Sequence, residues 1–142
     1  MPSSRQGWNK NTKTMVTGFE KETAPLSDYE MDTILPVMVR CLSKKRGKSN
    51  AVTNKKIVKG MKAQGYDIDD IRVRKLISHI RINGLVPCLI ATNTGYYVAT
   101  EEVEVQDYID SLQGRESAIK AVREAMERQI KTISQSQAIV SA

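Results

Sequence analysis

The stretch DDIRVRKLISHIRINGLVPCLIATNTGYYVAT, which spans Asp69–Thr100, decides the fold of this 142-residue chain. Its first half carries apolar residues at three- and four-residue spacing, a pattern typical of an amphipathic helix, and Asn83-Gly84 supplies a stop. Two short apolar, β-branched runs follow, 86–92 and 96–100, with the turn sequence Asn93-Thr94-Gly95 between them. The stretch therefore predicts a helix, a tight turn and a β-hairpin in that order.

The faces of this predicted helix follow from its angular period of about 100° per residue. One face is apolar and consists of Val73, Leu76, Ile77 and Ile80. The opposite side is mainly polar and basic, with Arg74 and Arg81 on one flank, and it carries Arg72, Lys75, Ser78, His79 and Ile82. We therefore expect the helix to bury the first face and to expose the second.

A helix is also expected upstream, where Ser27-x-x-Glu30 has the form of a capping box in front of an apolar stripe. Pro36 lies inside that stripe and lacks a backbone donor, so the helix either kinks there or begins later. The loop Lys44–Gly47, with three consecutive cations, is expected to end it.

A further helix is expected between these two, with Thr53 or Asn54 as its cap and Gly65 just past its end. The preceding segment, Ala51–Thr53, is available as a third strand beside the hairpin. Three helices closed by a hairpin make a winged helix, so the fold class is α+β, mainly helical.

The last quarter of the chain predicts a long amphipathic helix, or two helices if Gly114 breaks it, that opens with acidic residues at Glu101, Glu102 and Glu104. Its apolar residues recur at nearly heptad spacing and form a candidate dimerisation seam of Leu112, Ile119, Val122, Met126, Ile130 and Ile133. The seam either folds back as ordinary core or pairs with another copy, and its extent favours a homodimer. The expected division is a flexible arm 1–25, a winged-helix domain 26–100, the C-terminal helix 101–133 and a tail 134–142.

Charge is concentrated in the first 99 residues, which hold 17 Lys/Arg against 8 Asp/Glu, while the remainder has an excess of acids. Such a field attracts polyanions. No apolar run reaches the length of a membrane span, and Cys41 and Cys88 lack metal-ligand spacing and suit free thiols. His79 is the single histidine, and the sequence contains no phosphate loop and no catalytic set. We therefore expect no enzyme activity, metal, cofactor or small-molecule ligand, and a cytoplasmic location.

The basic residues define the candidate DNA contacts, although a merely solvated charged face is the alternative explanation. Residues of the third helix would lie in the major groove, and the others would contact phosphates. The uncharged turn at 93–95 makes insertion of the wing into the minor groove doubtful. The candidate contacts are Lys44, Lys45, Arg46, Lys55, Lys56, Lys59, Arg72, Arg74, Lys75, Ser78 and His79.

Three motifs together resemble small winged-helix proteins encoded by bacteriophages and prophages. They are VRKLIxxIRxxG at 73–84, Pro87 with GYYxAT at 95–100, and EExxxxxYIxSLxxR at 101–115. The resemblance covers roughly residues 50–133 and implies a winged-helix fold and binding of double-stranded DNA. The expected function is that of a phage or prophage transcriptional regulator or DNA-transaction factor. The resemblance also implies a location in a bacterial host cell, either free in the cytoplasm or associated with the nucleoid. The alternative is a winged-helix adaptor that docks proteins through its long C-terminal helix.

Overall fold

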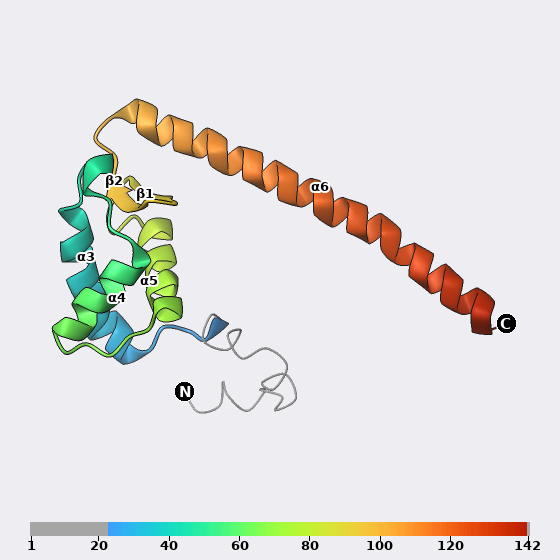
Figure 1. Cartoon of the computed structure of the whole chain (residues 1–142), viewed down its shortest axis with the longest axis horizontal. Helices are drawn as coiled ribbons and strands as arrows, with labels where there is room; N and C mark the ends of the chain where they lie inside the picture. Colours follow the sequence, from blue (N-terminus) through green and yellow to red (C-terminus); the bar gives the residue numbers. More distant parts are fainter. Residues whose placement is uncertain (1–22, 142) are drawn as a thin grey trace. The chain divides into compact units, whose positions relative to one another are not determined.

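The computed structural model describes residues 23–141, with side chains through residue 135, and the predicted arm therefore lies almost wholly outside it. The described chain is mainly helical, with a two-stranded antiparallel sheet and a long C-terminal helix (Figure 1). Its contacts separate two compact units that meet at Thr100. The elements are η2 (Glu30–Ile34), α3 (Leu35–Ser43), η3 (Lys48–Asn50), α4 (Asn54–Ala63), α5 (Asp70–Ile82), β1 (Leu89–Thr92), β2 (Gly95–Val98) and α6 (Glu102–Ser141).

The capping box at the start of the first helical segment is confirmed. The Ser27 amide donates to Glu30 Oε1 at 2.9 Å, and the Glu30 amide donates to Ser27 Oγ at 3.1 Å. Pro36 does not delay the start of the segment, which is helical from residue 28. Instead η2 forms a π-helical turn immediately before α3, in which the Leu35 amide donates to the Glu30 carbonyl five residues back. A wider turn here accommodates the proline, whose ring would clash with the carbonyl four residues earlier.

The caps of the next two helices are also resolved by the structure. Thr53 Oγ1 accepts from the Lys56 amide at the start of α4, and Asp69 Oδ1 accepts from the Arg72 amide at the start of α5. Gly65 follows α4 with a φ of +89°, a conformation that L side chains rarely adopt. Each helix thus starts and stops where local side-chain chemistry satisfies its free backbone groups.

The hairpin pairs β1 with β2 in antiparallel register, with Leu89 opposite Val98 and Thr92 opposite Gly95. A third segment joins it at one residue, because Val52 forms an antiparallel bridge with Tyr96 through hydrogen bonds of 3.0 and 2.8 Å. The segment 51–53 therefore contributes a single bridge to the sheet and no full strand. Its backbone passes so close to β2 that only a glycine fits at position 95.

The core of the first unit lies between the three helices and the hairpin. The predicted apolar face of α5 is buried, since Val73, Leu76, Ile77 and Ile80 are at most 2% exposed. Ile34, Met38 and Leu42 meet them from the first helical segment, and Met61, Val86, Leu89 and Val98 complete the cluster. Most of the stability of these short helices therefore comes from packing of one apolar face each.

The second unit is the single 40-residue helix α6, in which Gly114 is tolerated without a break. It opens with a cap, because the Glu101 amide donates to Glu104 Oε1 at 3.1 Å. The helix continues past residue 133, where the sequence predicts a tail. The six predicted seam residues are all exposed, from 39% at Leu112 to 69% at Ile119.

Candidate nucleic-acid interface

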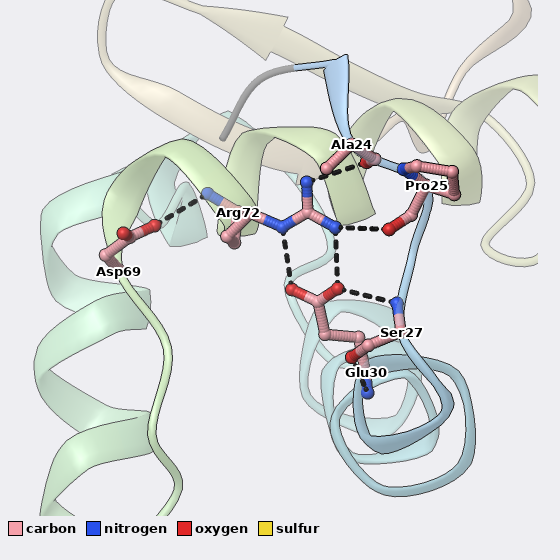
Figure 2. Close-up of polar contacts among 6 residues, drawn as sticks. All are labelled: Ala24, Pro25, Ser27, Glu30, Asp69 and Arg72. Atoms are coloured by element: carbon pink, nitrogen blue, oxygen red, sulfur yellow. Dashed lines mark hydrogen bonds and ion pairs between the residues drawn. The ribbon is translucent and has the colours of Figure 1, made fainter. Parts of the chain in front are cut away.

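Arg72 makes the most extensive polar contacts of the residues drawn in Figure 2. Its Nε donates to Glu30 Oε2 at 2.9 Å and its Nη2 donates to Glu30 Oε1 at 2.6 Å, so the carboxylate is held by two parallel bonds. Nη1 donates to the Ala24 carbonyl and Nη2 also donates to the Pro25 carbonyl. The guanidinium thereby ties the start of α5 to the chain in front of η2.

This arrangement corrects the expectation that Arg72 faces solvent and a DNA groove. The Arg72 side chain is only 13% exposed and the Glu30 side chain 10%. Arg74, expected on a flank of the helix, is 63% exposed and makes a 3.7 Å ion pair with Asp70 on the same helix. The assignment of Arg72 to the outer face was therefore wrong.

The burial of the pair makes folding dependent on the charge of Glu30. The hydrogen bond from Arg72 lowers the pKa of Glu30 despite the opposing effect of burial, and the bonds with Ser27 lower it further. Hydrogen bonds and charge from Glu30 raise the pKa of Arg72, so this side chain stays charged.

We expect acid to weaken the unit through this carboxylate. Because its pKa is lower in the folded than in the unfolded state, its stabilisation is complete above the unfolded value and is lost as pH falls through the folded value. Urea denaturation at a series of pH values below about 5 should show this loss. Glu30→Gln, which cannot ionise, should have a lower free energy of unfolding at neutral pH and should lose less of it as the pH falls. Parallel plots of this free energy against pH for the two proteins would contradict the assignment.

The C-terminal half of α5 borders a hollow of about 450 Å³ instead of presenting a plain exposed surface. Lys75 and His79 are half-buried, while Ser78 is exposed and Ile82 is 80% exposed. The hollow is lined by Leu26, Met31, Lys75, Ser78, His79, Ile82 and Asn83. The expected basic outer face is thus partly covered by the segment before α3, and its accessible part is mixed polar and apolar.

The cations of α4 are placed as the sequence predicts. Lys55, Lys56 and Lys59 are exposed, and Lys62 near the end of the helix is exposed as well. Among residues 23–135, none of these four lysines takes part in a salt bridge. Thus α4 presents a row of exposed cations.

Asn54 fixes the start of this lysine-bearing helix. Its Nδ2 donates to the Asp70 carbonyl at 3.1 Å, and its Oδ1 accepts from the Tyr96 hydroxyl at 3.4 Å. One side chain therefore links α4 to the first turn of α5 and to β2. Sequence analysis considered Asn54 only as a helix cap and missed this bridging role, because both partners are more than 15 residues away in the chain.

The second basic group, Lys44–Arg46, lies beside the end of the hairpin. The Val98 amide donates to the Lys45 carbonyl at 2.7 Å, and Arg46 pairs with Val98 in a parallel bridge. Lys44 and Arg46 are exposed, whereas Lys45 is half-buried. The group Lys44–Arg46 is therefore attached to β2 at Val98, whereas the lysines of α4 follow a segment that is attached to β2 at Tyr96.

The described residues hold no cluster of three metal-ligating side chains. Cys41 and Cys88 are free and exposed. Within the described part of the chain, every helix is too short or too polar to cross a membrane. Comparisons of the chain with protein-family models, with curated proteins and with solved structures found no match.

Proposed function

We propose that the first unit is a winged-helix domain that binds double-stranded DNA, in a phage or prophage regulator of transcription or in another DNA transaction. The observation that carries this proposal is the row of exposed lysines on α4, which make no ion pair within the described residues. A surface of unpaired cations releases counterions when it meets a phosphate backbone, and this release favours binding.

The order of elements supports the winged-helix assignment. Three helical segments are followed by a hairpin, and Val52 adds to the hairpin from the segment between the first two. In such domains the third helix enters the major groove, and the neighbouring helix contacts the backbone. In this chain these roles correspond to α5 and α4.

The structure changes which side chains of α5 would meet DNA. Arg72 is unsuited to base contact because its three side-chain nitrogens already donate to Glu30 and to two carbonyls. Arg74, Lys75, Ser78 and His79 remain for the groove. Among these only Arg74 has a guanidinium that can contact guanine through two bonds, and it also pairs with Asp70, so we propose modest sequence specificity.

Replacing Lys55, Lys56 and Lys59 together by glutamine should weaken DNA binding for all sequences. Because each lysine neutralises about one phosphate, the slope of log affinity against log salt should become shallower by up to about three. Affinity at about 0.1 M salt should fall at least tenfold, on the order expected for three lost phosphate contacts. Fluorescence anisotropy with a random duplex over a salt series measures both quantities.

A matched control removes three cations from α6 instead, by replacing Lys120, Arg128 and Lys131 with glutamine. This variant has the same net charge as the first, so equal losses in both would indicate a general charge effect and no interface on α4. If the unaltered protein fails to bind duplex at low salt, the DNA proposal fails. The winged-helix adaptor for proteins then becomes the better explanation.

We propose further that α6 mediates self-association, because its six seam residues are exposed in the described structure. Large apolar side chains at heptad spacing on one helix are typical of coiled-coil interfaces. This part of the proposal is independent of DNA binding.

The double variant Ile119→Asp/Met126→Asp should be monomeric, because two charges on each copy would be buried in the seam. Light scattering coupled to size exclusion measures the mass. The control is Ser117→Asp/Ala121→Asp, which adds the same charge to the opposite side of the helix and should remain associated. A monomeric unaltered protein would contradict self-association.

A further inference from the structure

The exposed apolar line of α6 has a strict seven-residue repeat, Leu112, Ile119, Met126 and Ile133. In a coiled coil, residues at this spacing all face the partner helix. A second line, Tyr108, Arg115, Val122 and Gln129, runs beside it and completes the pair of core positions. The two lines define the register of any paired helix, and the charge pattern next to them identifies its direction.

One flank of these two lines reads Ile109, Glu116, Arg123, Ile130, again at seven-residue spacing, so Ile130, which the sequence predicts as part of the seam, lies beside the core positions. All four side chains are exposed. The order is apolar, acidic, basic, apolar. When it is read in the opposite direction, each acidic residue is matched with a basic one and each apolar residue with an apolar one. When two copies run in opposite directions, Glu116 lies opposite Arg123 of the second copy and Ile109 opposite its Ile130.

The other flank has the same symmetry. It reads Ser111, Ala118, Ala125, Thr132, so Ala118 lies opposite Ala125 of the second copy when the helices run in opposite directions. The core layers agree with this register, since they place Ile119 opposite Val122 of the second copy. In an antiparallel pair, the midpoint of each flank lies about one residue from the midpoint of the core layers, and the two displacements have opposite directions. The residue numbers of the two flanks show this displacement.

A parallel pair would place each core residue next to the same residue of the second copy. Arg115 would then face Arg115 across the core, while Glu116 and Arg123 would lie beside Ser111 and Ala118 of the second copy and lose their complementary charges. Like-charge contacts are destabilising, most of all where side chains are desolvated. The antiparallel register avoids these contacts, because Arg115 lies opposite Met126 and the flanking charges are complementary.

We infer that α6 pairs with α6 of a second copy in antiparallel orientation, centred close to Lys120. The inference rests on the self-association proposed above and adds its direction. Within each helix, Arg123 also pairs with Glu127, so in the dimer it bridges an acid of its own copy and one of the second copy. Its exposed guanidinium has enough donors for both.

The orientation determines how far apart the two DNA-binding units are attached. A 40-residue helix is about 60 Å long, so antiparallel pairing puts the two attachment points near opposite ends of a rod of about that length. A parallel pair would join both units at one end, where two half-sites one helical turn apart, about 34 Å, are readily reached. The antiparallel protein is instead suited to two widely spaced sites or to two DNA segments.

The test measures the distance between spin labels in the full-length protein, with Cys41→Ser and Cys88→Asn removing the native thiols. A label at Asp107→Cys should give a distance of about 40 Å between copies in the antiparallel pair and less than about 20 Å in a parallel one. A second label at Ser117→Cys lies near the centre and should give a short distance in both orientations. It reports that pairs have formed.

A long distance at 107 with a short one at 117 supports the inference. Short distances at both positions would overturn the antiparallel orientation and leave self-association intact. No dipolar coupling at 117 would overturn both the antiparallel orientation and self-association. DNA binding would still be tested separately by the titration. The three results therefore separate failure of the inference from failure of the proposed function.

Charge reversal provides a second measurement. Glu116→Arg should raise the dissociation constant about tenfold, because it creates two repulsive contacts with Arg123 per antiparallel pair. Adding Arg123→Glu to the same chain restores opposite charges and should recover most of the loss in analytical ultracentrifugation. An unchanged dissociation constant for Glu116→Arg would overturn the inference, since in a parallel pair position 116 lies beside the uncharged Ser111 of the second copy.

Discussion

Arg72→Met is expected to lower the free energy of unfolding by about 3 kcal/mol, near the lower end for loss of one partner from a buried ion pair. The substitution leaves the Glu30 carboxylate about 10% exposed without its two guanidinium bonds, and it also removes the donors to Ala24 and Pro25. Urea denaturation followed by circular dichroism gives the value. Methionine preserves most of the apolar stem, so lost packing contributes little.

The matched control is Arg74→Met on the same helix. Arg74 also pairs with an acid, but at 3.7 Å and with both side chains more than half exposed, so its loss should cost less than about 0.5 kcal/mol. The double variant Glu30→Leu/Arg72→Met should be more stable than Arg72→Met, because no unpaired charge remains buried. Equal costs for Arg72→Met and Arg74→Met would contradict a structural role for the buried pair.

Gly95→Ala is expected to destabilise the first unit by more than about 2 kcal/mol, since both its backbone conformation and its surroundings require glycine. Its φ is +125°, and a Cβ at this position would lie 2.5 Å from the Val52 carbonyl oxygen. The methyl group would force apart the bridge between Val52 and Tyr96. Thermal denaturation measures the loss.

Gly65→Ala separates the two causes, because Gly65 has a φ of +89° with open space around its Cβ position. Only backbone strain acts there, and a loss of about 1 kcal/mol is expected. If Gly95→Ala costs no more than Gly65→Ala, the close approach of Val52 to β2 is unimportant for stability.

Local signals in the sequence predicted most of the helix starts. Ser27, and Thr53 from the two candidates Thr53 and Asn54, each accept from an amide three residues ahead, so the information needed lies within one turn of helix. The buried face of α5 was equally accessible from periodicity. The π-helical turn before Pro36 was not, because sequence shows that proline disrupts a helix without showing how the backbone adapts.

The two arginines of α5 show why the candidate site was harder to predict. Arg72 and Arg74 lie about 90° and 110° from the centre of the apolar face, on opposite sides of it. Angle alone cannot reveal which of these flanks another helix covers. That depends on Glu30, 42 residues earlier in the chain, whose role as a capping residue was visible and whose role as an ion-pair partner was not.

The ion pair between Glu30 and Arg72 also bears on the entropic cost of folding. The chain between the two residues must close a loop of 42 residues before the pair can form, and loop closure has an entropic cost that precedes any gain from the contact. The apolar contacts of Ile34 and Met38 with α5 close loops of similar length, so the ion pair and this part of the core carry the same entropic cost. Formation of one brings the partners of the other together, and the unit therefore gains both kinds of contact for a single loop closure.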